Sequence, residues 1–245
     1  MNSMKFLGAG LAMGLAAIGP AAGQGYAAGK AAVAISRQPV LAGTMLRTLL
    51  IGQSIAETSG ILGLVVGITL LVGSKSALPD WSVAAAMIGS GLAVGLSAMG
   101  PGLGSGLIVG KALEAISRTP GATGKITITM LLGQALAENA CILGFVVAML
   151  PLLTKNKILD TGDETYWVTV LGGMGRHIGA GLSIGLGAFG AAVGIGYAGS
   201  RAVGGVGANI DHASTIQRTM FVGMAVSESM AISSFVVAIT LLMTG

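Results

Sequence analysis

Long apolar stretches alternate with short polar segments along the whole chain. Two such stretches flank the turn AISRQPVLAG within residues 1–76, and the arrangement returns around AISRTPGATG in 77–158 and around ANIDHASTIQR in 159–245. Each stretch exceeds the roughly 20 residues that a helix needs to cross a bilayer. Lipid-exposed strands could not satisfy their backbone groups, so helices are expected. The pattern predicts an all-α membrane protein with six transmembrane helices, paired into hairpins at 1–76, 77–158 and 159–245.

The three hairpins are copies of one unit. A shift of 81 residues carries the first unit onto the second without a gap, and a further 90 carries the second onto the third, as with Glu57, Glu138 and Glu228. Because each unit crosses the membrane twice, all three hairpins are predicted to point the same way, unlike the inverted repeats of many transporters. The first apolar stretch has the look of a secretory signal, but its match to internal helices argues against that interpretation.

Composition agrees with a membrane protein and adds a packing prediction. The chain has 53% hydrophobic and 9% charged residues and a mean hydropathy of +0.86, which leaves too little polar surface for a soluble globule. The chain has 42 glycines, and in the first helix of each hairpin glycines recur four apart on several faces. Small residues let helix backbones approach closely. Glycine on more than one face suits the inner wall of a closed ring, and a simple glycine-zipper dimer is the alternative.

Charge and cysteine content exclude several functions. The formal charge of +4 comes from scattered basic residues without a Lys/Arg run, which argues against nucleic acid as a partner. Cys141 is the single cysteine, so an internal disulfide or a paired-cysteine site is excluded. The glycine-rich strings lie inside apolar segments, so no nucleotide or other cofactor is expected. Basic residues gather in the hairpin turns, which places these turns in the cytoplasm and both termini outside, in the inner membrane of a prokaryote.

The second helix of each hairpin has one carboxylate near its middle. The three residues are Glu57, Glu138 and Glu228. An acid at the bilayer centre costs about 2.5–3.5 kcal/mol on insertion scales and usually marks an ion or proton pathway. Such a carboxyl is neutralised by a bound proton or by a small cation. The repeated acid therefore predicts reversible ion binding, with hydrogen bonding between helices as the purely structural alternative.

These residues carry a family resemblance over the whole chain. GQGYAAGKAAVAISRQP, followed by LLIGQSIAETSGILGLVVGITLL, resembles the c subunit, or proteolipid, of rotary ATP synthases, with a glycine-rich inner helix, an Arg-Gln-Pro turn and an outer helix that holds an essential acid. The first turn has the signature at Arg37, Gln38 and Pro39, and the second has Arg118 before Thr119 and Pro120. The third departs from it with Ala208, Asn209 and Ile210.

The resemblance implies a non-catalytic rotor subunit. It implies a homo-oligomeric ring in membrane lipid, turning against a stator subunit that supplies an arginine, with central-stalk subunits at the cytoplasmic turns that hold Arg37, Gln38, Pro39 and Arg118. If the ring contains this polypeptide alone, its hairpin number is a multiple of three. With three catalytic sites in the partner head, the ions moved per ATP then equal the number of chains.

The transported ion is either Na⁺ or H⁺. Sodium needs several oxygen ligands, whereas a proton needs little more than the carboxylate. In sodium-binding members of the resembled family, the acid is followed by Ser or Thr and the inner helix supplies a glutamine. Polar residues follow the acids here, which favours Na⁺ at the three glutamates: Thr58, Asn139 and Ser229. Gln24 matches the inner glutamine, but Ser105 and Ile195 replace it in the later units, and this replacement argues against Na⁺.

Three residues are candidates for support of the site: Ser105, at the inner-glutamine position of the second hairpin, Gln53 and Gln134. Gln53 and Gln134 lie one helical turn before their acids, where they can fix carboxylate geometry or simply bond helix to helix. A different class of protein also remains open, namely a stand-alone channel or carrier whose acids line its own pore. In that case the three glutamates should face a common lumen within one chain.

Overall fold

Six long helices make up the structure, a computed structural model that describes residues 2–73, 81–153 and 166–244. They are α1 (Asn2–Arg37), α2 (Ala42–Gly73), α3 (Trp81–Arg118), α4 (Thr123–Leu153), α5 (Tyr166–Ala208) and α6 (Ala213–Met243). All six are long and apolar enough to cross a membrane, which confirms the sequence prediction. The predicted hairpin boundaries, between 76 and 77 and between 158 and 159, lie outside the described residues.

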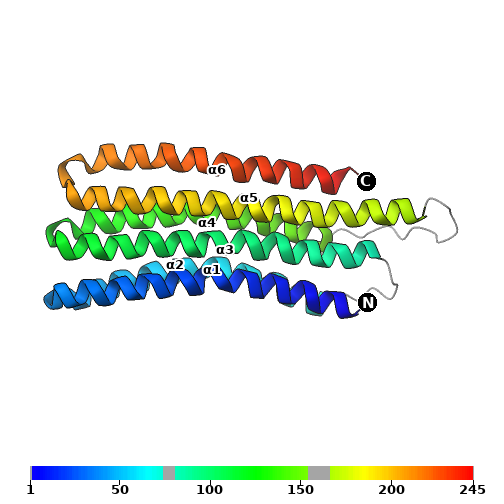
Figure 1. The fold of residues 1–245 in the computed structure, drawn as a ribbon, viewed down its shortest axis with the longest axis horizontal. Coiled ribbons are helices and arrows are strands. Elements are labelled where there is room, and N and C mark those ends of the chain that lie inside the picture. Colours follow the sequence, from blue (N-terminus) through cyan, green and yellow to red (C-terminus); the bar gives the residue numbers. More distant parts are fainter. Residues whose placement is uncertain (1, 74–80, 154–165, 245) are drawn as a thin grey trace.

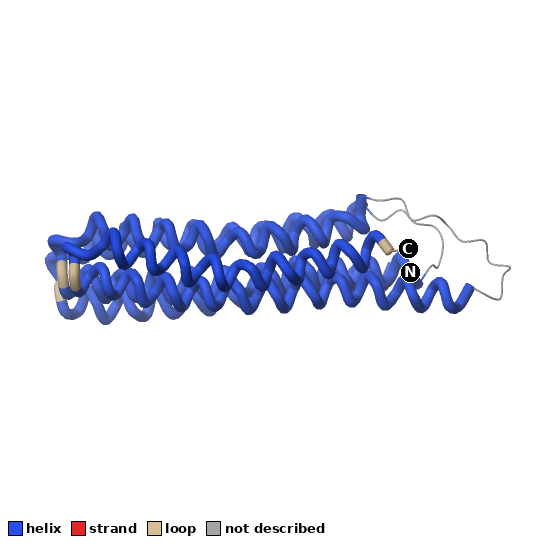
Figure 2. The backbone as a smooth tube through the Cα atoms, turned by 90° about the horizontal axis from the view of Figure 1, so that it is seen from above, coloured by secondary structure: helices blue, strands red, loops and turns tan. Residues whose placement is uncertain are grey.

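The hairpins are parallel copies, as the repeat predicts. Their three turns lie together at one end of the bundle, and the two chain termini lie at the other (Figures 1 and 2). Each turn is one short 3₁₀ helix: η1 (Pro39–Leu41), η2 (Pro120–Ala122) and η3 (Ile210–His212). The residue before each has nearly the same backbone φ, −139° at Gln38, −134° at Thr119 and −143° at Asn209. The third turn therefore keeps this geometry without the Arg-Gln-Pro sequence.

The helices form two layers. Helices α1, α3 and α5 pack against one another as an inner row, and α2, α4 and α6 lie over them. Two outer helices also contact the next hairpin. Helix α2 contacts α3 as well as α1, and α4 contacts α5 as well as α3. The central helix α3 is covered from both sides, with 72% of its most apolar window buried, whereas only 11% is buried in α6.

Glycines set the spacing of the inner row. A Cβ added at Gly106 on α3 would collide with the backbone of Gly23 on α1, and one added at Gly196 on α5 would collide with the backbone of Gly104 on α3. Only hydrogen atoms fit at these crossings, so the backbones approach closely and gain dispersion contacts that lipid would otherwise provide. The glycine periodicity is thus a packing feature of the inner row.

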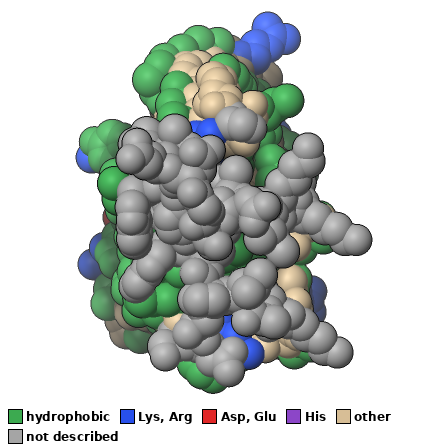
Figure 3. Space-filling view, turned by 90° about the vertical axis from the view of Figure 1, so that its right-hand side faces the viewer, with side chains coloured by type: hydrophobic (Ala, Val, Ile, Leu, Met, Phe, Trp, Pro, Cys, Tyr) green, Lys and Arg blue, Asp and Glu red, His purple; other side chains and the backbone are tan. Residues whose placement is uncertain are grey.

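The outer surface is apolar, as a lipid-facing surface should be. Large aliphatic side chains on the outer helices are exposed, among them Leu50 and Ile61 on α2, Ile142 on α4, and Val226 and Ile232 on α6. Viewed from the end at which the termini lie, hydrophobic side chains occupy much of the visible rim, together with a few Lys and Arg (Figure 3). In water, an apolar surface of this extent would favour aggregation, and in a bilayer it matches the hydrocarbon.

Candidate ion-binding sites

The three predicted acids occupy the same place in the fold. Glu57 lies at the middle of α2, Glu138 at the middle of α4 and Glu228 at the middle of α6. Their exposure differs within one chain, because Glu57 is exposed while Glu138 and Glu228 are half-buried. The difference follows from position, since Glu138 and Glu228 each have a preceding hairpin beside them and Glu57 lies in the first hairpin.

Glu57 is bound by its own hairpin. The Gln24 Nε2 on α1 donates to Glu57 Oε1 at 3.2 Å, and the same amide lies 3.5 Å from the Gln53 carbonyl oxygen. Gln53 returns the contact, since its Nε2 donates to the Gln24 carbonyl oxygen at 3.4 Å. The predicted pair of glutamines therefore forms a small network that links the inner helix to the acid. It leaves one side of the carboxylate open.

Glu138 lies between two hairpins. The hydroxyls of Thr58 on α2 and Ser105 on α3 face its carboxyl group. Two oxygens at this place, Glu138 Oε1 and Ser105 Oγ, are buried without a hydrogen-bond partner among the described residues. Buried polar atoms are seldom left unpaired. The carboxyl group and the two hydroxyls therefore form a site, with two of its oxygens unpaired, that suits a proton or a small hard cation.

Gln134, the predicted support residue, forms its side-chain hydrogen bond with the first hairpin and not with its own acid. Its side chain is fully buried, and its Nε2 donates at 2.8 Å to the Gly52 carbonyl oxygen on α2. The contact joins the first two hairpins and is of the kind that the structural alternative expects. Gln53 differs from it, because Gln53 contacts the inner-helix glutamine that holds Glu57.

Glu228 has the poorest polar surroundings. The Asn139 Nδ2 on α4 donates to Glu228 Oε1 at 3.2 Å. The position that corresponds to Gln24 and Ser105 is Ile195, and the position that corresponds to Gln53 and Gln134 is Met224, and both side chains are fully buried. Asn139 and Ile195 thus stand where Thr58 and Ser105 supply the hydroxyl pair at Glu138, and Met224 stands where the second hairpin has Gln134.

The residue after each acid serves the acid of the following hairpin. Thr58 follows Glu57 in sequence but faces Glu138, and Asn139 follows Glu138 but bonds to Glu228. Ser229 follows the last acid and has no further hairpin in the chain to serve. Its hydroxyl donates to the Val226 carbonyl oxygen three residues back, as the Thr58 hydroxyl does to that of Ile55. The sequence analysis named all three residues, and the structure places Thr58 at Glu138 and Asn139 at Glu228.

The predicted turn residues are available at the surface. Arg37 ends α1, and Gln38 and Pro39 form the exposed start of η1. Arg118 ends α3 and is exposed, but it forms an ion pair with Glu114. One arrangement near these turns escaped the sequence analysis. Lys30 and Arg201 each lie over a tyrosine ring, that of Tyr26 and that of Tyr197. The spacing of four residues in each pair was the signal.

Comparison with known proteins gives one consistent result. The chain matches the family model of the ATP synthase C subunit at residues 7–70, 88–150 and 178–241, and each matched segment contains one of the three acids. It is 57% identical over 65 residues to the ATP synthase c subunit of Alkaliphilus oremlandii, which is 26% of this chain and 73% of that protein. It is 47% identical over 78 residues to that of a Synechococcus strain, which is 32% of this chain and 95% of that protein.

Proposed function

Because this chain belongs to the family of ATP synthase C subunits, we propose that it forms the rotor ring of a rotary ATP synthase or ATPase and carries Na⁺ or H⁺ on Glu57, Glu138 and Glu228. The observation that carries this proposal is the repeated pairing of a mid-membrane acid with a polar side chain of the preceding hairpin, Thr58 with Glu138 and Asn139 with Glu228. Two such pairings, with a third acid at the same position of the first hairpin, fit an ion carrier better than a structural bond.

The chemistry of the proposal is charge cancellation. A carboxylate that faces hydrocarbon is costly unless a proton or a cation neutralises it. The outer helices present apolar side chains around the acids, so a neutralised site can move past lipid and an empty one cannot. Loading and unloading then require a polar environment, which the resembled family provides through a stator subunit with an arginine. The chain itself supplies the carboxyl groups and the side chains that hold them in place.

Assembly into a ring is supported by two open glycine faces. Gly10, Gly14, Gly25 and Gly29 on α1 have nothing close to their free face, whereas the corresponding Gly91, Gly95, Gly106 and Gly110 on α3 are packed against α1. Gly190 on α5 is also free, although its counterpart Gly100 packs against the Phe189 backbone. The free face of α1 thus resembles the face of α3 that packs against α1 within the chain. A second copy of the chain could pack against it in the same way. Head-to-tail repetition of such an interface closes a ring when the rotation fits.

A neighbouring chain would also complete the first site. In each site inside the chain, the polar residue after one acid lies at the next acid. Continued around a ring, the same register brings Ser229 of one chain to Glu57 of the following chain. Glu57, which has an open side within a single chain, then gains a hydroxyl in addition to Gln24. The number of complete sites equals the number of hairpins only in the closed assembly.

Sodium is the ion that the oxygen-rich sites favour. Ser105, Thr58 and Ser229 place hydroxyl oxygens at two of the three glutamates when the ring register is applied, and the Gln24 side-chain amide adds a polar contact at Glu57. Hard cations require such ligands. Proton binding remains the alternative, and the Glu228 site, with Ile195 and Met224 beside Asn139, supports it.

The rival function, a pore within one chain, has less support. Its acids should converge on a lumen, but here they lie on three separate outer helices, and Glu57 is exposed. The surface around them consists of large aliphatic side chains. We also propose that the turns face the cytoplasm of a prokaryote, where Arg37, Gln38, Pro39 and Arg118 meet the central stalk. A ring of this chain alone then moves as many ions per ATP as it has chains.

Carbodiimide labelling tests the proposal directly. A hydrophobic carbodiimide, applied to the purified detergent-resistant assembly at fixed pH, should modify the three glutamates, which peptide mass spectrometry resolves individually. Added Na⁺ should slow the modification if Na⁺ is bound, and only acidity should change its rate if H⁺ is carried. Glu114, held by Lys111 and Arg118 near the turns, is the internal control and should show no sodium effect. A monomeric protein that is labelled at none of the three would refute the rotor function.

A further inference from the structure

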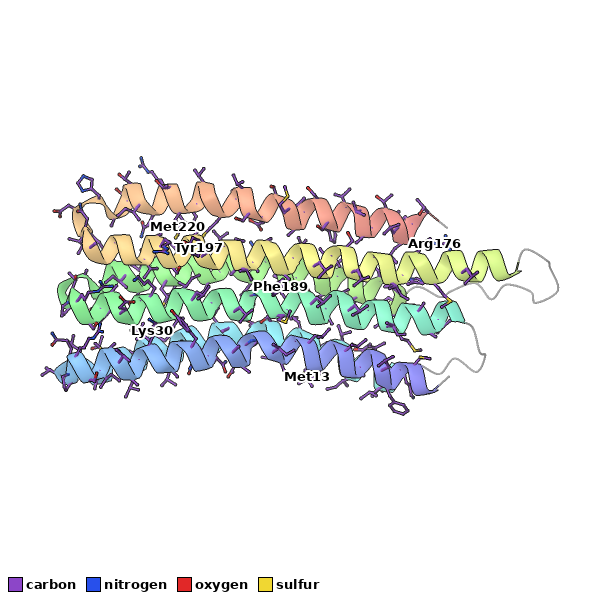
Figure 4. All side chains as sticks on the ribbon, in the orientation of Figure 1. Met13, Lys30, Arg176, Phe189, Tyr197 and Met220 are labelled. Carbon is purple, nitrogen blue, oxygen red and sulfur yellow. The ribbon has the colours of Figure 1, made fainter. Side chains whose placement is uncertain are left out.

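A pocket lies on the free side of the inner helix row, near the hairpin turns. Its volume is about 240 Å³, and its lining comes from α1, α3 and α5 alone: Tyr26, Lys30, Leu107, Lys111, Glu114, Tyr197, Ser200 and Arg201. The outer helices contribute nothing to this lining, so the pocket opens away from the ion sites. Lys30 and Tyr197 mark two of its walls in Figure 4. We refer to these eight residues as the basic pocket.

The cations of the basic pocket come from one repeated position. The shifts that superpose the hairpins carry Lys30 onto Lys111 and Lys111 onto Arg201. A basic residue therefore stands at this place on every inner helix. All three line a single pocket because the glycine crossings hold α1, α3 and α5 close together.

The charge of the basic pocket is only partly balanced. Its one carboxylate, that of Glu114, lies 3.2 Å from Lys111 Nζ and also pairs with Arg118, which is outside the pocket. Within residues 2–73, 81–153 and 166–244, neither Lys30 nor Arg201 forms an ion pair. Two positive charges are thus left for an anion.

Two tyrosines hold these free cations in place. Lys30 Nζ lies 5.5 Å from the ring centre of Tyr26, and the Arg201 guanidinium lies 5.0 Å from that of Tyr197. Arg201 Nη2 also donates to the Tyr197 hydroxyl oxygen at 3.0 Å, which leaves the hydroxyl proton free to donate to a ligand. Neither contact uses all the N–H donors of Lys30 or Arg201. Such donors suit a phosphate oxygen, which accepts charge-assisted hydrogen bonds.

The depth of the basic pocket indicates where its ligand resides. Gln24 is level with Glu57, to which it bonds, and Lys30 follows Gln24 by six residues, or about 9 Å along the helix. Half of a bilayer core is about 15 Å. With the acids at the centre of the membrane, the Lys30 backbone lies inside the core, and its Nζ lies over the ring of Tyr26, one helical turn nearer the centre. An unpaired cation at that depth is expensive unless it meets an anion.

We propose that the basic pocket binds the phosphate group of an anionic phospholipid on the inner side of the helix row. The phosphate contacts Lys30, Lys111 and Arg201 and accepts the Tyr197 hydroxyl proton, while Leu107 contacts apolar parts of the lipid. This inference rests on the membrane-spanning part of the proposed function and not on ion transport. In a ring, the basic pockets form a cationic band around the lumen.

The test measures lipid binding to the purified, full-length assembly. Dihexanoyl phosphatidylglycerol, dihexanoyl phosphatidylcholine and inorganic phosphate are titrated separately, and bound molecules are counted by native mass spectrometry. The wild type should bind phosphatidylglycerol at least about tenfold more tightly than phosphatidylcholine, because each unpaired cation near the membrane surface contributes roughly fivefold. High salt should reduce this preference.

Matched variants separate the pocket from general charge. The pocket variant carries Lys30→Gln, Lys111→Gln and Arg201→Gln, and the control carries Arg47→Gln, Lys125→Gln and Arg218→Gln, which removes the same charge from the outer helices at the same end. The pocket variant should lose the preference, and the control should keep it. A charge-keeping variant with Lys30→Arg, Lys111→Arg and Arg201→Lys should retain it, which shows that lost binding does not reflect misfolding.

Three results would overturn the inference. Equal binding of the two lipids by the wild type removes the anion site, and an unchanged preference in the pocket variant places that site elsewhere. Inorganic phosphate that binds as tightly as phosphatidylglycerol assigns the basic pocket to a soluble anion and not to lipid. Labelling of the three glutamates is measured on the same samples, so loss of lipid binding with intact labelling leaves the proposed rotor function untouched.

Discussion

The two interfaces between hairpins share one backbone arrangement and differ at the acid. In both, glycines bring the inner helices together, and an outer helix presents its acid to the preceding hairpin. At the first interface Glu138 faces the hydroxyls of Thr58 and Ser105, and at the second Glu228 meets the Asn139 amide beside Ile195. The repeat therefore conserves the packing within this chain more strictly than it conserves the chemistry around the acid.

The reason lies in what each position tolerates. A side chain at Gly104 or Gly106 would collide with a neighbouring backbone, which cannot move without shifting a whole helix. The neighbours of the acid need only leave room and a polar contact, and a hydroxyl, an amide or an aliphatic group can each occupy the place. Three sites of unequal ion affinity can therefore coexist in one ring.

The largest expected effect is common to both interfaces. Glu138→Gln and Glu228→Gln should each reduce ion-coupled ATP synthesis in membrane vesicles to background, because the amide is permanently neutral and can neither bind nor release the ion. A ring position that never changes its state stops a rotor even when the other positions work. Glu114→Gln serves as the control and should leave coupling largely intact. Appreciable activity in one of the two variants would mean that the corresponding site is not a carrier.

A serine exchange sharpens the comparison between the two sites. Ser105→Ala should weaken the sodium protection of Glu138 against carbodiimide by about tenfold, because one oxygen partner is lost. Ile195→Ser should strengthen the protection of Glu228, since it adds that oxygen to the poorer site. Ser90 provides the control, because it is another buried serine on α3 with an unpaired hydroxyl, and Ser90→Ala should change neither. Equal protection of all three sites in the wild type would remove the difference from which this comparison starts.

The register between hairpins can be tested separately. Asn139→Leu should reduce the sodium protection of Glu228 by about threefold, since interhelical hydrogen bonds in membranes contribute roughly 0.6 kcal/mol each. Glu138, the neighbour of Asn139 in sequence, should be unaffected. Thr58→Val should likewise alter Glu138 and spare Glu57. If each variant instead altered the acid next to it in sequence, the side chains would serve their own hairpin and the site assignment would be wrong.

Sequence alone predicted much of this molecule for identifiable reasons. The long apolar stretches predicted the six helices, and the repeated glycines and acids predicted the parallel hairpins, because helix length and the repeat are local properties of the chain. The candidate residues of the proposed sites were named from the same repeat. The sequence did not show which of these residues lie together. Superposing the hairpins pairs equivalent positions, and it does not say which acid Thr58 or Asn139 faces. That depends on how α2 leans over α3 and how α4 leans over α5. The basic pocket was missed likewise, since it forms only across three helices.

The smallest expected effect concerns a buried amide that one interface has and the other lacks. Gln134 Nε2 donates to the Gly52 carbonyl oxygen at 2.8 Å, and at the corresponding place Met224 lies against Gly133, the counterpart of Gly52. Gln134→Met should lower the stability of the first interface by about 0.6 kcal/mol, the mean for such bonds in membranes. Met224→Gln should gain a similar amount, because its amide can reach the Gly133 carbonyl oxygen in the same register. Resistance of the purified chain to unfolding in sodium dodecyl sulfate measures both, and the double exchange should restore the wild-type value.

A loss in both single variants would show that the two interfaces differ in backbone register as well as in side chains, so that the Glu138 and Glu228 sites could no longer be compared position by position.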